Sequence, residues 1–166
     1  MSKKLSSTSV LPADTDTAFA LRTSTEWVEQ KAGRLQDGSL VQERTAGHGG
    51  QVELVLLRDI PGDVPGMFRR FVPADGRVTQ RELWTPAGDG TYRVTWSLGF
   101  DGAPGSVSGE GELVPEGEGS ALHLDGVAQV SVPIIGGKAE AFLVPLVEGI
   151  MQQEGQLLAS LLADRT

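Results

Sequence analysis

The clearest pattern in the chain is strict alternation of apolar and polar side chains. It is most regular over residues 91–100, with apolar positions at Tyr92, Val94, Trp96, Leu98 and Phe100. Alternation with a period of two is typical of a strand that buries one face. The same pattern predicts strands over residues 78–85, 106–114 and 121–132.

The segment before these strands predicts a further strand and two short helices. Residues 5–11 alternate apolar side chains with Ser and Thr, and a proline ends them, so we expect a strand toward a sheet edge. Either Asp14 or Asp16 can cap a first helix. Thr23 and Glu26 have the spacing of a capping box, which predicts the start of a second helix.

Residues 39–60 predict a hairpin whose strands meet at the glycine-rich turn of residues 47–50, because glycine permits the positive φ of a tight turn. One face of the second strand carries Val52, Leu54, Leu56 and Ile60, together with the charged Arg58. Residues 61–73, bounded by prolines, read as a connector with an apolar side that includes Met67 and Phe71.

Residues 136–164 lack alternation and predict one long helix with a broad apolar stripe. Pro145 lies inside it, so we expect a bend over residues 141–145. The order of elements is then a strand, two short helices, six strands and a long helix. Strands joined by short turns form an antiparallel sheet, and its apolar face needs a cover. We therefore expect an α+β fold in which a curved seven-stranded sheet grips the C-terminal helix.

Composition narrows the classes of partner. The 166 residues suit one domain spanning 1–166, and a net charge of −8 without a basic stripe excludes nucleic acid and disfavours anionic membranes. The absence of cysteine removes thiolate chemistry. No segment is apolar long enough for stable membrane insertion or resembles a signal peptide, so the cytoplasm is the expected location. The sequence carries no signal for an oligomeric state.

Two stretches resemble a known superfamily. The run from Val130 to Glu140 (VSVPIIGGKAE) is similar to the strand-to-helix junction of a bacterial family of unknown function within the START-like (SRPBCC) superfamily. The strand that carries Glu82 and Trp84, with the connector before it, resembles the same family. The resemblance implies a helix-grip fold with a ligand cavity between helix and sheet. It implies no catalytic residue.

Polar side chains at apolar positions mark the candidate site. Glu154 lies at the centre of the stripe of the long helix, while Arg58, Gln80 and Glu82 occupy inward positions of strands. A buried carboxylate is costly, so Glu154 must be paired, protonated or facing a wet cavity, unless the helix end passes the sheet edge and Glu154 meets water. Inward glycines at 109 and 111 favour open space over a filled core.

We therefore hypothesise a pocket with an apolar wall and a polar end. The wall comprises Met67, Phe71, Trp84, Trp96, Phe100, Phe142 and Val147, and the polar end comprises Arg58, Glu82 and Glu154. Pockets of this kind are mostly apolar with a few converging polar groups. The alternative is that the aromatic side chains simply fill the core.

Three functions remain open from the sequence. The leading one is binding of a hydrophobic or amphipathic small molecule, with Arg58 available to a carboxylate or phosphate head group. The second is a cyclase- or hydratase-like enzyme in which Glu154 or Glu82, its pKa raised by burial, acts as a general base. The third is a protein-interaction module that uses residues 61–73. Neither His48 nor His123 has a second ligand at metal spacing, and we expect no metal or cofactor.

Overall fold

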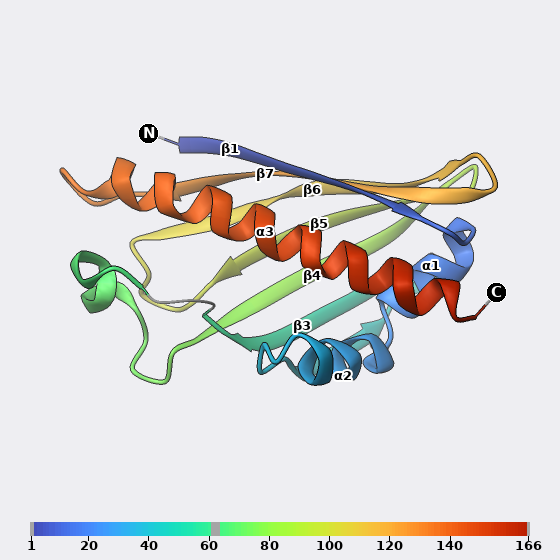
Figure 1. Cartoon of the computed structure of the whole chain (residues 1–166), viewed down its shortest axis with the longest axis horizontal. Helices are drawn as coiled ribbons and strands as arrows, with labels where there is room; N and C mark the ends of the chain where they lie inside the picture. Colours follow the sequence, from blue (N-terminus) through green and yellow to red (C-terminus); the bar gives the residue numbers. More distant parts are fainter. Residues whose placement is uncertain (1, 61–63, 166) are drawn as a thin grey trace.

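The computed structural model describes residues 2–60 and 64–165. A seven-stranded antiparallel sheet, in the order β1-β7-β6-β5-β4-β3-β2, curves around a long C-terminal helix (Figure 1). The strands are β1 (Ser2–Leu11), β2 (Leu40–Ala46), β3 (Val52–Asp59), β4 (Arg77–Gly88), β5 (Thr91–Gly99), β6 (Gly105–Glu116) and β7 (Gly119–Val130). The helices are α1 (Thr15–Arg22), α2 (Thr25–Arg34), η1 (His48–Gly50), η2 (Gly66–Phe71) and α3 (Gly136–Ala163). The predicted α+β architecture is confirmed.

The two short helices begin at polar caps. Asp14 Oδ1 accepts a hydrogen bond of 2.7 Å from the backbone N–H of Thr17 and caps α1. The capping box predicted at Thr23 is wrong by one residue: Ser24 Oγ accepts from the N–H of Trp27 at 3.1 Å and caps α2. The reason is that Thr23 still terminates α1, where its hydroxyl donates to the carbonyl of Phe19.

The inward glycines of the sheet make room for Trp96. This residue pairs with Gly109 on β6, which in turn pairs with Gly126 on β7. A Cβ atom at Gly126 would lie 2.5 Å from the Trp96 ring, and one at Gly111 would lie 3.1 Å from Val94. At Gly109 the backbone of Asp125 and Gly126 fills the space where a side chain would lie, and at Gly111 and Gly126 neighbouring side chains and backbone fill it. The expectation that these glycines favour open space is corrected accordingly.

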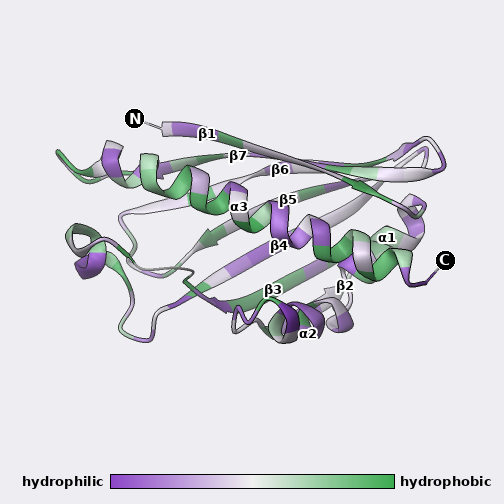
Figure 2. Cartoon of the chain, in the orientation of Figure 1, coloured by the Kyte–Doolittle hydropathy of each residue, from purple (hydrophilic) through white to green (hydrophobic). Residues whose placement is uncertain are grey.

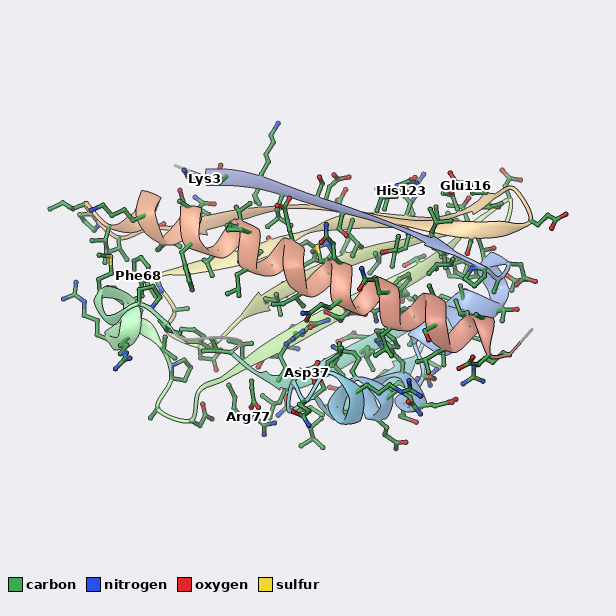
Figure 3. The ribbon with its side chains drawn as sticks, viewed as in Figure 1. Lys3, Asp37, Phe68, Arg77, Glu116 and His123 are labelled. Atoms are coloured by element: carbon green, nitrogen blue, oxygen red, sulfur yellow. The ribbon has the colours of Figure 1, made fainter. Side chains whose placement is uncertain are left out.

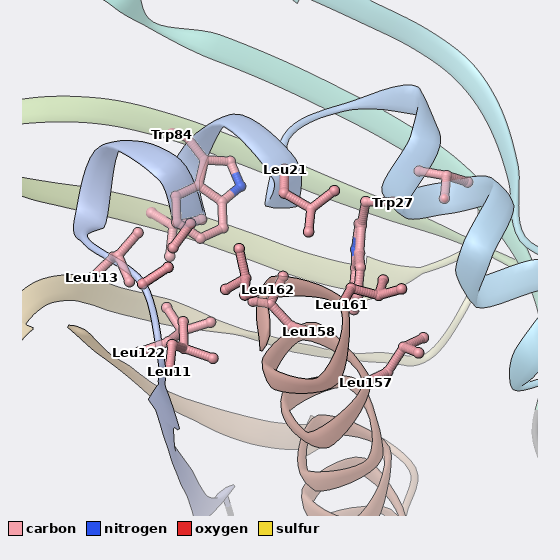
Figure 4. Close-up of a cluster of buried hydrophobic side chains, with 14 of the residues drawn as sticks. Leu11, Leu21, Trp27, Trp84, Leu113, Leu122, Leu157, Leu158, Leu161 and Leu162 are labelled. Carbon is pink, nitrogen blue, oxygen red and sulfur yellow. The ribbon is translucent and has the colours of Figure 1, made fainter. Parts of the chain in front are cut away.

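The helix α3 runs without interruption through Pro145. Its C-terminal half packs into the main hydrophobic core through Leu157, Leu158, Leu161 and Leu162 (Figure 4). These leucines pack with Leu11 of β1, Leu21 of α1, Trp27 of α2 and Trp84 of β4. Hydrophilic bands nevertheless interrupt the hydrophobic surfaces of α3 and β4 (Figure 2). Those bands include the polar side chains from which the candidate site is built.

Candidate ligand-binding site

A cavity of about 180 Å³ lies between the N-terminal half of α3 and the sheet. The helix contributes Phe142, Leu143 and Leu146, and η2 contributes Phe68 and Phe71. The rings of Phe68 and Phe142 lie 5.9 Å apart between their centroids, so η2 packs against the helix across one side of the cavity. Strands β4 to β7 supply the floor through Val78, Leu98, Val107 and Val130. The lining is hydrophobic apart from Arg58 and Ser106.

A smaller cavity of about 50 Å³ adjoins the first toward the C-terminal half of α3. The two share Arg58, Leu98, Val147 and Ile150 in their linings. The smaller one is polar at one side, where it is lined by Arg22, Gln80, Glu82 and Glu154. Trp84 and Trp96 complete its wall. The candidate site is thus an apolar chamber with a small polar annex, and Arg58 stands between them.

The structure distributes the predicted pocket residues over both chambers. Phe71, Phe100 and Phe142 line the larger cavity, whereas Trp84, Trp96, Glu82 and Glu154 line the smaller one. Arg58 and Val147 belong to both. Met67 lines neither and is 50% exposed, and the buried Phe68 takes its place on the wall. The 3₁₀ geometry of η2 explains this, because residues three apart, such as Phe68 and Phe71, share one side of such a helix.

One half of the polar end is an ion pair between α1 and β4. The guanidinium of Arg22 donates to both carboxylate oxygens of Glu82, at 2.9 and 3.0 Å. Trp84 Nε1 donates to the same carboxylate at 2.9 Å, and Gln80 Nε2 donates to it as well. Arg22 also lies over the rings of Trp27 and Trp84. A bidentate pair of this kind is among the stronger hydrogen-bonded ion pairs, and it engages both oxygens of the Glu82 carboxylate.

The other half is centred on Glu154 of α3. Lys31 Nζ of α2 lies 3.0 Å from Glu154 Oε1, and Arg58 Nη1 of β3 lies 3.4 Å from Glu154 Oε2. Asp37, in the loop after α2, faces the same two cations at 3.5 and 3.7 Å. Arg58 Nη1 also donates to Gln80 Oε1 at 3.3 Å, which connects the two halves. In Figure 3, Asp37 marks this polar end of the site and Phe68 the hydrophobic end.

The carboxylates of Glu154 and Glu82 are held in their ionised form. Burial alone raises the pKa of Glu154, but the surrounding cations, led by Lys31 and Arg58, lower it to about 2 from the ordinary 4.5. Burial also raises the pKa of Glu82, and the charge and hydrogen bonds of Arg22 outweigh it and lower the pKa. The prediction of a carboxylate whose pKa is raised by burial is therefore wrong for both residues, because each has a buried cation beside it.

The sequence reading missed Arg22, Lys31 and Asp37. Lys31 is fully buried, and its spacing contains a signal, because it follows the buried Trp27 by four residues on one face of α2. Arg22 follows the buried Ala18 by four residues in the same way. Asp37 lies in a loop, where no periodicity applies, and only its contacts reveal its role.

Comparison with known proteins now places the chain in a family. Residues 6–162 match the family described as Protein of unknown function (DUF2505). The chain belongs to this family. A relative of the DUF2505 chain is an uncharacterized protein of Mycobacterium tuberculosis strain H37Rv, 30% identical over 101 residues. That stretch covers 59% of this chain and 58% of the relative. The chain therefore matches only about three-fifths of the length of this mycobacterial relative.

Solved structures establish the fold of the DUF2505 chain. The Zhui aromatase/cyclase from Streptomyces sp. R1128 superposes with a TM-score of 0.63 at 14% identity, covering 99% of this chain and 96% of that one. Norcoclaurine synthase from Thalictrum flavum, in complex with dopamine and hydroxybenzaldehyde, gives a TM-score of 0.58 at 13% identity, covering 100% and 89%. The expected helix-grip fold is confirmed.

Over residues 2–60 and 64–165 of the DUF2505 chain, no helix is long and apolar enough to cross a membrane. The same residues contain no group of three or more His, Asp and Glu side chains arranged to hold a metal ion.

Proposed function

We propose that this DUF2505 protein binds a small apolar molecule in the larger cavity between α3 and the sheet. The observation that carries the proposal is a hydrophobic cavity of about 180 Å³ between α3 and the sheet. Protein interiors contain few voids larger than a water molecule, and an apolar cavity of about 150 Å³ stays dry and binds benzene. The chamber therefore suits a molecule of one aromatic ring with short substituents.

The structural neighbours support a guest of this size. The Thalictrum flavum enzyme of the same fold was solved with dopamine and hydroxybenzaldehyde, both of which contain a single ring. Identity of 13% transfers the fold alone, so neither the reaction nor its residues carry over to this chain. What carries over to the proposal is that a sheet gripping a helix can enclose such molecules.

Binding without catalysis accounts for the polar end better than a cyclase- or hydratase-like reaction. A general base works best with a pKa near the operating pH, whereas Glu154 has a pKa of about 2 and Glu82 is engaged by Arg22. An interaction module built on residues 61–73 is less well supported: Phe68 and Phe71 are turned toward the cavity, and residues 61–63 lie outside the described part of the chain.

Filling the chamber tests the proposal. Ala139 is a buried residue of the cavity lining on α3, so Ala139→Phe places a ring inside the chamber. Ala141→Phe adds the same ring at an exposed position of the same helix and is the matched control. Binding of isopropylbenzene and of acetophenone is measured by calorimetry and by ligand-observed NMR.

We expect the wild type and Ala141→Phe to bind these compounds alike and Ala139→Phe to lose at least about tenfold in affinity, equivalent to about 1.4 kcal/mol. Unchanged binding by Ala139→Phe would place the compounds elsewhere on the protein. The proposal fails if the wild type retains neither compound, nor any other one-ring compound of a broad neutral and charged panel.

A further inference from the structure

We infer that the ligand is electrically neutral, because the buried end of the cavity is charge-balanced and rejects anions and cations alike. This inference rests on the proposed function and specifies its ligand class. Among the described lining residues of the larger chamber, Arg58 is the charged one. Whether the chamber offers a counter-charge to a ligand therefore depends on whether the Arg58 guanidinium is already paired within the protein.

The two terminal nitrogens of Arg58 already face oxygen atoms of the protein, whereas its Nε is buried without a hydrogen-bond partner. Its side chain is buried, and its Nη1 and Nη2 atoms face Glu154 at 3.4 Å, Asp37 at 3.7 Å and Gln80 at 3.3 Å. A ligand carboxylate that approached this guanidinium would also come close to two carboxylates. The sequence-based expectation that Arg58 is available to a carboxylate or phosphate head group is therefore not supported by its contacts.

The positive and negative charges of the whole network are equal in number. Its cations are Arg22, Lys31 and Arg58, and its anions are Asp37, Glu82 and Glu154. Every cation has a carboxylate oxygen within 3.7 Å, and every carboxylate has a cation within the same distance. Adding one charged ligand would leave one unit of charge buried without a partner, and such a charge is strongly unfavourable in an apolar chamber.

The other described residues that line the chamber provide no counter-charge for a charged group of a ligand. The chamber wall is built mainly from phenylalanine, leucine, valine and isoleucine side chains, and Ser106, which also borders it, is exposed on β6. Hydrocarbons, aryl ketones and ethers of one-ring size meet these conditions. Aryl carboxylates and arylalkyl ammonium ions of the same shape do not.

A set of nearly isosteric compounds separates charge from shape. Isopropylbenzene, acetophenone, benzoate and α-methylbenzylammonium each carry a small branched group on one ring. At neutral pH we expect the first two to bind and the two ions to bind at least about tenfold more weakly, a difference of about 1.4 kcal/mol. Benzoate or the ammonium ion binding as tightly as acetophenone would overturn the inference while leaving the proposed function intact. If none of the four binds, nor any other one-ring compound of the broad panel, it is the proposed function that fails.

A change of network charge provides the positive test. Glu154→Gln and Asp37→Asn each remove one carboxylate beside Lys31 and Arg58, which leaves a surplus positive charge at the buried end. We expect benzoate affinity to rise about tenfold in these variants, while isopropylbenzene affinity stays constant. Asp37→Asn changes a loop residue and supplies the measurement should Glu154→Gln fail to fold.

Glu112→Gln is the matched control for that experiment. It removes the same charge from the outer face of β6, where Glu112 pairs with the exposed Arg93. We expect wild-type selectivity from it. Benzoate affinity that stays at the wild-type level in both network variants, or that rises equally in Glu112→Gln, would contradict the inference.

Discussion

The indole of Trp96 on β5 extends over β6 to Gly126 on β7. Trp96 pairs with Gly109 of β6, and Gly109 in turn pairs with Gly126 of β7. Neither glycine can accept a side chain without displacing the ring or the adjoining backbone. A large residue on one strand is therefore matched by the smallest residue on the next two strands.

Gly126→Ala should lower the free energy of unfolding by about 1–3 kcal/mol, because overpacking forces side chains or backbone out of place. Its Cβ would lie 2.5 Å from the Trp96 ring and 2.7 Å from the carbonyl oxygen of Ser108. Gly137→Ala, at a glycine with no neighbouring atom within 4 Å, is the control and should not destabilise the protein. Urea denaturation measures both, and equal stabilities would refute the packing argument.

Ile134 adopts an unusual backbone conformation. Its φ of 74° lies in the left-handed region, and its side chain is 94% exposed, so nothing in the described structure packs on it in return. A β-branched residue in this region is strained. Strain of this kind, unlike a buried cluster, can be removed by a single substitution.

We expect Ile134→Gly to stabilise the protein by up to about 1 kcal/mol, since relief of roughly 1–3 kcal/mol of strain is partly offset by the greater freedom of glycine when unfolded. The neighbouring Ile135 has a φ of −96°, so Ile135→Gly gains no such relief and should destabilise. Thermal unfolding of the two variants gives the comparison, and a loss of stability in Ile134→Gly would show that the side chain has an unrecognised contact.

The buried ion network joins α1, α2 and α3 to β3 and β4. Each of these elements supplies at least one charged member, from Arg22 on α1 to Glu154 on α3. Breaking one buried pair leaves a charge without a partner, which typically costs about 3–5 kcal/mol. The network therefore holds the helices in one register against the sheet.

Lowering the pH should weaken the buried ion network over a defined range of pH. Because the folded-state pKa of Glu154 is about 2, below its ordinary 4.5, its stabilising contribution is complete above about pH 4.5 and is lost as the pH falls toward 2. The depressed pKa of Glu82 acts in the same direction. A shift from 4.5 to about 2 corresponds to roughly 3 kcal/mol.

The measurement is urea denaturation of the wild type and Glu154→Gln at pH 7 and pH 3. The stability advantage of the wild type should shrink by roughly 2 kcal/mol between these values, since most of the pKa interval lies above pH 3. An advantage that stays constant with pH would mean that Glu154 is not ionised in the folded protein at pH 7.

How far the sequence predicts this site depends on the element concerned. Alternation along β4 correctly turns Gln80, Glu82 and Trp84 inward, because these three positions share the strand face that is buried. It contains no information on which cation meets which carboxylate. Lys31 and Glu154 are far apart in the chain, and their contact depends on how α2 and α3 pack on the sheet.

One half of the molecule is closely packed around α3, and the other half contains the larger cavity. Around the C-terminal half of α3, the leucines of the helix interlock with α1, α2 and β4. Around the N-terminal half, Phe142 and Leu143 are only half-buried and border the chamber. Pro145 lies in this half and removes one backbone donor of the helix. The ion network occupies the boundary between the halves.

Hydrogen exchange should report this division. We expect backbone amides of residues 136–147 to exchange faster than those of residues 151–162, because packing is looser beside the chamber. Acetophenone should slow exchange in the first segment, by up to about 2.7 kcal/mol of added protection at a concentration of one hundred times its Kd. Mass spectrometry of peptides from the two segments measures both effects. Uniform exchange along α3 would contradict the division.

The pairing of β1 with β7 has a consequence for how the protein is made. Ser2 pairs with Gln129 and Leu11 with Ser120, so the strand synthesised early needs a partner synthesised more than a hundred residues later. Contacts of such long sequence separation slow folding, since a large loop must close before they form. During translation β1 therefore remains unpaired until β7 has been made, and α3, which packs on both strands, is synthesised after β7. The cavity between α3 and the sheet can then close only after the strands that form its floor have been synthesised.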